Sequence, residues 1–301
     1  MFRVIIVNLK GGLGNQMFQY ALGYTLSKNK KVPLYFDLRL MEEEKIKPSP
    51  RNVPRDFDLD IFGINKDLVS KKDLIKTIQF PNNYRLRKYI SIILDNLNLF
   101  IFYEKKRVFN KKIFNNNFKN IYLDGLWQSE KYFKDFRDEI LKIYNFEKIK
   151  KKEKNINFLK KIDLSKSVCL NVRRTDFINN PEHNVVNINY YKNAFINFKN
   201  ILGDNLKIYV FSDDLEWCKK NLKFNNIEFV EHDYAGYKFY DYLYLMSSFK
   251  NFIIPNSSFG WWACWLSKYK DKVIMTPERW SGLIDESLID IVPPEWIRVK
   301  Y

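Results

Sequence analysis

The chain has 301 residues, 46% of them hydrophobic and 17% aromatic, which is enough for a substantial core in one large domain or two smaller ones. Its formal net charge of +16 favours acidic ligands, an anionic membrane surface or a polyanion as partners. With three widely spaced cysteines and only two histidines, a Cys/His zinc site is not expected, and a reduced intracellular protein is favoured.

No export signal or membrane span is predicted. Arg3 precedes only a short apolar run, which is not a signal peptide. The longest apolar stretch, residues 89–103, contains Asp95 and is too short to cross a bilayer. We therefore expect a soluble cytoplasmic protein. Its excess of lysines, dense at residues 148–154, leaves peripheral contact with an anionic inner membrane open.

The N-terminal half opens with a β-loop-α-β pattern, which is typical of a parallel sheet. Its segments are a strand at residues 4–9, a glycine turn at 10–14, a helix at 15–28 and a strand at 32–36. Residues 41–55 are polar, contain three prolines and predict a loop, whereas residues 60–120 predict helices of undefined order. A strand at 121–123 and an amphipathic helix capped by Ser129 follow.

The second half alternates between apolar strands and amphipathic helices. Strands are predicted at residues 168–172, 208–211, 227–230, 252–254 and 273–275. Helices are predicted at residues 190–200, 214–222, 240–248 and 259–267. This order predicts a doubly wound α/β domain. The charged stretch 148–161 separates the halves and gives two Rossmann-like domains, 1–155 and 156–301, facing a cleft.

Arg173 and Arg174 follow the predicted strand at 168–172, at the sheet edge where open α/β folds bind ligands. Each guanidinium presents a rigid fork of donors that suits phosphate oxygens, so the pair predicts an anion site. Asp176 lies within reach to hold one of the two arginines, and one interpretation is that it only orients Arg174. Taken alone, these residues are explained equally well by an Arg–Asp ion pair at a strand end.

Ser212, Asp213 and Asp214 follow the next predicted strand at the same edge. One carboxylate is suited to accept hydrogen bonds from a base or a ribose, and the other to cap the following helix. A cap alone would explain one aspartate but not both. A divalent metal is a weaker interpretation, because no second group of this kind lies on the phosphate side.

A third polar turn, residues 256–258, lies between a strand and a helix, where amides and hydroxyls suit a phosphate. The two tryptophans after it are interpreted as helix core. The glycine turn at residues 11–14 does not fit the dinucleotide fingerprint, because Met17 stands at the third glycine position. That turn is either structural or a place where Asn15 approaches a ligand closely.

An arginine pair, a carboxylate pair and a hydroxyl turn, each after its own strand, together predict a nucleotide-diphosphate site along one sheet edge. Arginines would neutralise the leaving diphosphate in place of a metal. The predicted reaction is therefore the transfer of a group from a nucleotide diphosphate.

Five segments, in order, resemble the α-1,2-fucosyltransferase family, glycosyltransferase family 11. They are residues 11–21 (GGLGNQMFQYA), 125–133 (GLWQSEKYF), 172–177 (VRRTDF), 212–214 (SDD) and 256–262 (NSSFGWW). No single segment is specific, but the combination is. The resemblance implies a GT-B fold, GDP-fucose as the donor substrate, a galactose-containing glycan as acceptor, inversion at the anomeric carbon, and neither metal nor cofactor.

The resemblance also implies roles for the two domains and for individual residues. The domain at 1–155 would lie on the acceptor side, and the domain at 156–301 would bind the nucleotide sugar, GDP-fucose. Arg173 would contact the diphosphate, Asp213 or Asp214 would recognise the guanosine, and Asn15 would approach the glycosidic region of the donor across the cleft. Hydroxyls at the third polar turn would cradle the phosphates. The predicted donor contacts are Asn15, Asn171, Arg173, Arg174, Ser212, Asp213, Asp214, Asn256, Ser257 and Ser258.

The arginine motif of the family usually begins with histidine, whereas this chain has Asn171, which can hydrogen-bond a nucleoside but cannot titrate near neutral pH. The predicted catalytic residues are Arg173, Asp176 and Glu182. Asp176, Glu182 and His183 are the candidate bases for the acceptor hydroxyl. Two alternatives stay open: a GT-B transferase for another nucleotide sugar, and a basic nucleic-acid-binding protein, for which the sequence holds no recognised module.

Overall fold

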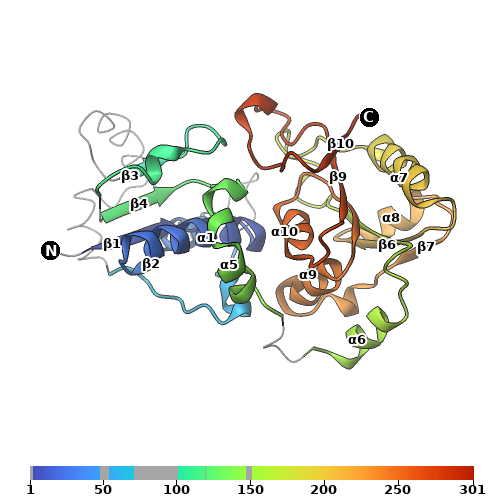
Figure 1. Ribbon diagram of the computed structural model, residues 1–301, viewed down its shortest axis with the longest axis horizontal. Coiled ribbons are helices and arrows are strands. Elements are labelled where there is room, and N and C mark those ends of the chain that lie inside the picture. The colour runs from blue at the N-terminus through green and yellow to red at the C-terminus, as the bar shows by residue number, and fades with distance from the viewer. Residues whose placement is uncertain (1–2, 48–53, 71–100, 119, 147–150) are drawn as a thin grey trace. The chain divides into compact units, whose positions relative to one another are not determined.

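The computed structural model describes residues 3–47, 54–70, 101–118, 120–146 and 151–301 (Figure 1). They belong to two compact units, Met1–Ile143 and Tyr144–Tyr301. Each unit is an α/β structure with its own parallel sheet. This confirms the predicted class, α/β with two Rossmann-like domains of the GT-B kind. The cleft between them stays a prediction.

The second unit begins at Tyr144, earlier in the chain than the domain boundary proposed after residue 155. The rings that follow the first unit explain this position. Tyr144 packs edge-on against Trp262 with 5.2 Å between ring centroids, and Phe146 packs against Tyr240 at the same distance. These aromatic contacts join residues 144–146 to helices of the second unit.

Four strands of the first unit pair in the order β2-β1-β4-β3, all parallel. Their bounds are β1 Val4–Asn8, β2 Leu34–Asp37, β3 Ile101–Tyr103 and β4 Asn120–Asp124. The helices described in this unit include α1 Leu13–Lys30, α2 Arg39–Ile46 and α5 Arg137–Ile143. All five residues of β1 are buried, as expected of an apolar run inside a parallel sheet. The predicted β-loop-α-β start is confirmed.

Three local predictions in this unit are wrong. The predicted loop at 41–55 begins inside α2, because helix-favouring Met, Glu and Lys residues continue to Ile46. Part of the region predicted to be helical, 60–120, forms strand β3, whose pairing with β4 outweighs a weak periodicity. Residues 71–100 of that region lie outside the described residues.

The third difference concerns the predicted helix after Ser129. Ser129 does act as an N-cap, since its hydroxyl accepts from the backbone N–H of Lys131, but it caps a 3₁₀ turn, η4 Glu130–Tyr132. A second 3₁₀ turn, η5 Lys134–Phe136, precedes α5. Phe133 between them has non-helical backbone angles (φ −141°, ψ 8°) and packs 6.0 Å from Phe18, so burial of its ring interrupts the helix.

Six strands of the second unit pair in the order β10-β9-β8-β5-β6-β7, again all parallel. Their bounds are β5 Ser167–Val172, β6 Lys207–Ser212, β7 Ile227–Phe229, β8 Asn251–Ile253, β9 Val273–Pro277 and β10 Ile297–Val299. The α-helices are α6 Glu153–Lys160, α7 Ile188–Leu202, α8 Leu215–Asn221, α9 Tyr240–Ser247 and α10 Ser258–Leu266 among the described residues. The five predicted strands and four predicted helices are confirmed. The edge strand β10 is missed, because two of its three residues are exposed and form no apolar run.

The strand order brings the polar turns together. β5 lies between β8 and β6, and all six of its residues are buried. Because these strands are parallel, the loops that follow β5, β6 and β8 emerge at one sheet edge. Figure 1 shows α7 on one side of this sheet and α9 and α10 on the other, as in a doubly wound domain.

Helix α10 is a core element. Seven of its nine residues are buried, and the indole N–H of Trp261 donates to the carbonyl of Ile291 at 2.7 Å. The interpretation of Trp261 and Trp262 as helix core is thus confirmed. Within the described ranges, no helix combines the length and the apolar character needed to cross a membrane.

Candidate functional site

Arg173 lies directly after β5, where its guanidinium forms a two-pronged contact with Asp176. Nε and Nη2 of Arg173 donate to the two carboxylate oxygens at 2.9 and 2.8 Å. Nη1 lies 3.2 Å from Oδ2 of Asp213, which follows β6. Carboxylates from two loops therefore fix the guanidinium plane. Asp176 orients Arg173, the first of the two arginines, and not Arg174.

The two aspartates after β6 contact the loop that carries Arg173 and Arg174. The Asp213 carboxylate accepts from the backbone N–H groups of Arg174 at 2.9 Å and Thr175 at 3.1 Å. Asp214 caps α8 by accepting from the backbone N–H of Trp217 at 3.1 Å, and its other oxygen lies 3.3 Å from Nε of Arg174. One carboxylate is a helix cap, as expected, and the other clamps a loop. Recognition of guanosine by either one stays a prediction.

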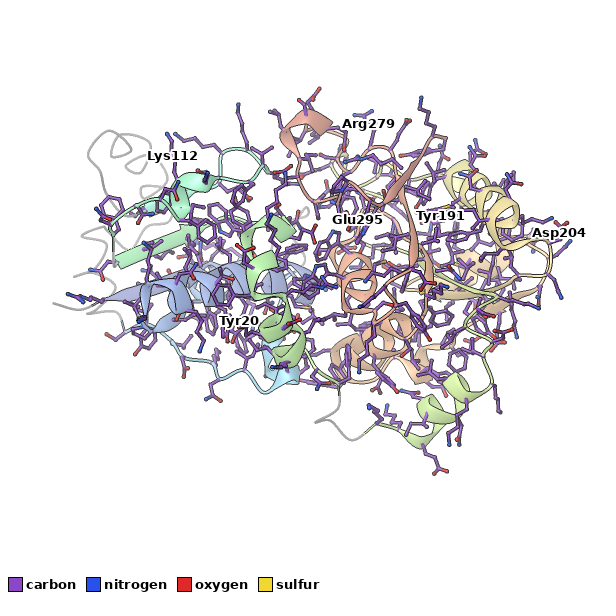
Figure 2. All side chains as sticks on the ribbon, in the orientation of Figure 1. Tyr20, Lys112, Tyr191, Asp204, Arg279 and Glu295 are labelled. Atoms are coloured by element: carbon purple, nitrogen blue, oxygen red, sulfur yellow. The ribbon has the colours of Figure 1, made fainter. Side chains whose placement is uncertain are left out.

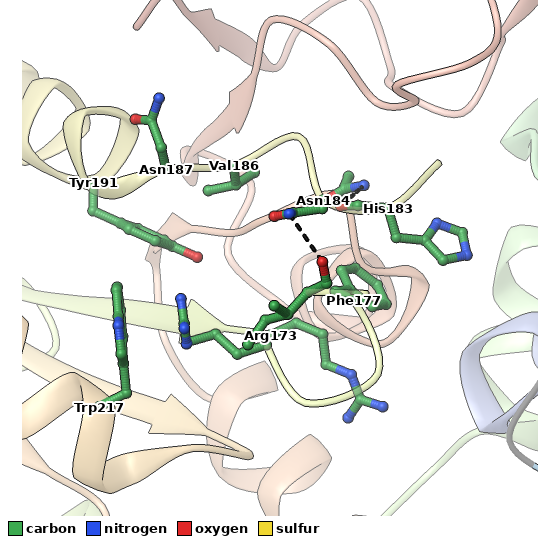
Figure 3. Close-up of a pocket in the computed structure, with 11 residues that line it drawn as sticks. Arg173, Phe177, His183, Asn184, Val186, Asn187, Tyr191 and Trp217 are labelled. Atoms are coloured by element: carbon green, nitrogen blue, oxygen red, sulfur yellow. Dashed lines mark hydrogen bonds between the residues drawn. The ribbon is translucent and has the colours of Figure 1, made fainter. Parts of the chain in front are cut away.

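A pocket opens beside the two arginines, and Figure 3 shows it. The Arg174 guanidinium lies over the Trp217 ring, 3.8 Å from its centroid, in a close cation–π contact. Tyr191, on α7, lines the same pocket. Phe177 and His183, stacked with 4.8 Å between ring centroids, line the same pocket. The pocket thus combines cations with flat aromatic surfaces.

Asn171, the next-to-last residue of β5, is buried behind the arginines. Its amide Nδ2 donates to the carbonyl of Phe211 at 3.1 Å, and its Oδ1 has no hydrogen-bond partner. A Cβ atom on Gly260 of α10 would lie only 2.7 Å from that oxygen. The close approach of α10 to β5 therefore depends on glycine at position 260.

The turn between β8 and α10 contains Asn256 and two serines. Nδ2 of Asn256 donates to the carbonyls of His183 at 3.1 Å and Trp280 at 3.0 Å, so this side chain joins two loops. Its buried Oδ1 has no partner, and the residue lines the pocket. Ser257 is the N-cap residue of α10 but its side chain makes no capping bond, and Ser258 is the first helical residue. The first-turn amides of α10 are those that a helix leaves without intrahelical acceptors.

The remaining predicted residues of this unit have different surroundings. Ser212 is buried and accepts from the backbone N–H of Asp214 at 2.9 Å, which makes it a turn residue. His183 lines the pocket, whereas Glu182 is outside the lining and its backbone carbonyl accepts from Gly282 at 2.9 Å. Of the candidate bases in this loop, the structure brings only His183 into the pocket.

Asn15 lies in the first unit, in the opening turn of α1. Its Oδ1 accepts from Nε2 of Gln128 at 2.8 Å. Gly11 has a left-handed backbone (φ 75°), and a Cβ there would lie 2.4 Å from Nδ2 of Asn15. The glycine turn is therefore required for Asn15 to pack where it does. Its approach to a donor stays a prediction.

Glu104, after β3, supports the segment that carries Gln128. Its carboxylate accepts from the backbone N–H groups of Leu126 at 2.7 Å and Trp127 at 3.0 Å. Trp127 has a left-handed backbone (φ 55°), which a non-glycine residue adopts only when its surroundings enforce it. Burial raises the pKa of Glu104, although the two N–H groups and nearby cations oppose the shift.

The described residues contain no group of three or more His, Cys, Asp or Glu side chains placed to hold a metal ion. The cysteines are buried, and burial raises the pKa of the Cys218 thiol to about 11. None of the three is therefore suited to act as a thiolate nucleophile.

Four residues that contact or lie beside predicted site residues were not predicted from the sequence: Trp217, Tyr191, Gln128 and Glu104. Trp217 had a usable signal, because a residue three positions after an N-cap lies in the first turn, close to the preceding strand end. Tyr191 and Glu104 had none, since their roles depend on loops distant in sequence.

Two Rossmann-like units, one of which carries arginines and a helix start at one sheet edge, are suited to an enzyme that binds a nucleotide diphosphate. The sequence model of the family described as glycosyl transferase family 11 matches residues 3–300. The chain therefore belongs to this family. Two relatives from Escherichia coli are each 31% identical. One is an alpha-1,2-colitosyltransferase, with 99% of both chains covered, and the other is the O-antigen biosynthesis glycosyltransferase WbnK, with 97% of this chain and 99% of the relative covered.

Among solved structures, the fucosyltransferase NodZ from Bradyrhizobium aligns with a TM-score of 0.44 and 15% identity. The alignment covers 88% of this chain and 93% of NodZ.

Proposed function

We propose that this protein is an inverting α-1,2-glycosyltransferase that moves L-fucose from GDP-fucose to a galactose hydroxyl of a surface glycan. The observation that carries the proposal is the fixed pair of guanidiniums after β5, at the same sheet edge as the start of α10. Arg173 is held by Asp176 and Asp213, so it needs little reorganisation to receive negative charge.

In the proposed reaction, the acceptor hydroxyl attacks the anomeric carbon of the donor on the face opposite GDP. The bond between that carbon and the diphosphate oxygen breaks, and GDP leaves with the electron pair. Arg173 and Arg174 stabilise the charge that develops on the diphosphate, together with the first amides of α10. No metal or cofactor takes part in this proposal.

The proton of the acceptor hydroxyl must pass to a base. Both oxygens of Asp176 already accept from Arg173, so we assign Asp176 to positioning that arginine. His183 is the candidate base that lines the pocket, and Glu182 is the other candidate in the same loop.

A second donor deserves a test because one relative is an alpha-1,2-colitosyltransferase. Colitose is fucose without its 3-hydroxyl, so one hydrogen-bonding group decides between the two sugars. A site that hydrogen-bonds this hydroxyl would reject the deoxy sugar strongly, whereas an apolar site would accept both.

The experiment is product analysis by mass spectrometry with GDP-fucose, GDP-colitose and GDP-mannose, each offered with a β-galactoside. We expect a fucosylated product, and linkage analysis should place the sugar on the 2-hydroxyl of galactose. A product from GDP-colitose alone would replace the donor in the proposal. Transfer from GDP-mannose alone would reject both 6-deoxy donors.

A further inference from the structure

The connection between β3 and β4 carries a dense run of positive charge. Residues 105–112 are KKRVFNKK, and no Asp or Glu occurs from Lys105 to Leu123. Lys105, Lys106, Lys111 and Lys112 are all exposed. Figure 2 labels Lys112 on the 3₁₀ turn η3 Lys111–Ile113 of this connection. We call residues 105–112 the basic loop.

The basic loop is anchored through its apolar members. The Phe109 ring packs 5.0 Å from the ring of Tyr132, which is itself buried. The Tyr132 hydroxyl accepts from the backbone N–H of Asn110 at 2.9 Å and donates to the carbonyl of Val108 at 3.3 Å. Tyr132 thus fixes the Phe109 ring and the Val108 carbonyl, while the lysines on both sides of these two residues are at the surface.

The turn at the far end of the loop is fixed as well. The Asn110 side chain caps η3 by accepting from the backbone N–H of Lys112 at 3.1 Å, and Ile113 is fully buried. Asn116 donates to the carbonyls of Lys112 at 2.9 Å and Ile113 at 2.7 Å. The lysines therefore project from a built surface, which lowers the entropy lost when they contact a partner.

The start of the loop is also linked to Gln128 and Asn15 of the same unit. It follows Glu104, whose carboxylate holds the backbone of Leu126 and Trp127. The next residue, Gln128, contacts Asn15. Glu104 therefore connects the start of the basic loop to the segment that carries Gln128.

We propose that the basic loop docks this protein on an anionic membrane surface. Charge complementarity selects this partner: five cations within eight residues, without an acidic residue among them, match the juxtamembrane clusters that bind anionic lipid. The exposed groups are lysines on an irregular loop, which suits a diffuse field of headgroups better than a single buried phosphate. The proposal does not depend on which sugar is transferred.

The test is co-sedimentation of the purified full chain with vesicles of phosphatidylcholine alone or mixed with phosphatidylglycerol. The test variant is Lys106→Gln/Lys111→Gln/Lys112→Gln. The matched control, Lys192→Gln/Lys220→Gln/Lys223→Gln, removes the same charge from exposed positions of the second unit. Thermal unfolding of each variant shows that the fold is retained.

We expect binding to the anionic vesicles only. Each lysine near the membrane surface should contribute roughly fivefold to the affinity, so the loop variant, which lacks three, should bind about 100-fold more weakly. The affinity of the control variant should stay within about tenfold of that of the unaltered protein. Binding to the vesicles should weaken as the salt concentration rises from ~0.1 M to ~1 M, because the Debye screening length falls from about 10 to about 3 Å.

Three results would overturn the proposal. The first is an equal loss of binding in both triple variants, which would assign the effect to overall charge. The second is failure of the unaltered protein to bind anionic vesicles. The third is tighter binding to single-stranded DNA than to vesicles at the same salt. Because no donor is present, none of them bears on the proposed transferase reaction.

Discussion

Asp176 holds Arg173 by both carboxylate oxygens, at 2.9 and 2.8 Å, three residues apart in a loop that starts at the end of β5. Asp213 fixes the remaining nitrogen of the same guanidinium from the next strand. In an unliganded protein, such contacts keep an arginine oriented until a stronger anion competes for it. A diphosphate would find the donors of Arg173 already aligned, and this arrangement leads to the predictions below.

Replacing Arg173 by alanine should abolish most turnover while leaving the fold intact. The change removes stabilisation of the leaving diphosphate of about 3 kcal/mol or more, which corresponds to a loss of roughly 150-fold or more in kcat/KM. Steady-state kinetics measure the loss in kcat/KM. Thermal unfolding shows whether the variant keeps the unfolding temperature of the unaltered protein. Turnover near that of the unaltered enzyme would remove Arg173 from the mechanism.

An Asp176→Asn variant separates positioning from proton transfer. If Asp176 only orients Arg173, the variant should lower kcat by about 10-fold or more and keep the shape of its pH profile. If Asp176 is the base, the acidic limb of that profile should disappear. Asp204→Asn, at a surface ion pair with Lys199, is the matched control and should change neither quantity.

The guanidinium carbon of Arg174 lies 3.8 Å from the centroid of the Trp217 ring. Trp217→Leu should weaken binding of GDP by about 2- to 30-fold, because the cation–π contact that fixes the guanidinium is lost. Trp217→Phe keeps an aromatic face and should recover part of the affinity. Calorimetric titration with GDP measures both. Equal affinities in the two variants would show that the aromatic face does not matter.

Gly260→Ala should destabilise the second unit although alanine favours a helix. The new Cβ would meet Oδ1 of Asn171 at 2.7 Å and Ile254 at 3.3 Å, and overpacking of this kind costs about 1–3 kcal/mol. A double-mutant cycle with Asn171→Ala checks the cause by chemical denaturation. The double variant should be more stable than the sum of the two changes predicts, whereas additive effects would place the strain elsewhere.

Glu104 should make the free energy of unfolding depend on pH. Because burial raises its native pKa, the folded chain binds more protons than the unfolded chain between the ordinary value of 4.5 and the raised value. Its contribution to stability therefore falls as the pH rises through this window. Urea denaturation at a series of pH values should show this slope in the unaltered protein and not in Glu104→Gln. An identical slope in both proteins would contradict the assignment.

The strands and helices of the second unit were predictable because their apolar runs are buried and parallel, as β5 shows along its whole length. β10 was not, since an exposed edge strand carries no such run. The sequence indicated which polar residues gather at the sheet edge but not which of them pair. These pairings include the hydrogen bonds of Arg173 to Asp176, those of Asp213 to the loop after β5, and the contact of Trp217 with Arg174. They depend on loop conformations that are set by contacts between residues distant in sequence.

The first unit was harder to predict for the same reason. Ser129 was a correct cap, yet the ring of Phe133 interrupts the helix that its sequence favours. The hydrogen bonds from the backbone of Leu126 and Trp127 to Glu104 join residues more than twenty positions apart, and neither propensity nor periodicity predicts contacts at that separation.

The most direct measurement is release of GDP from GDP-fucose, with and without a β-galactoside, in the presence of EDTA. We predict that the acceptor stimulates release, that EDTA leaves the rate unchanged, and that Arg173→Ala loses the stimulated component. Failure of the unaltered protein to bind GDP-fucose by calorimetry, or release that requires an added divalent metal, would contradict an arginine-based site for this donor.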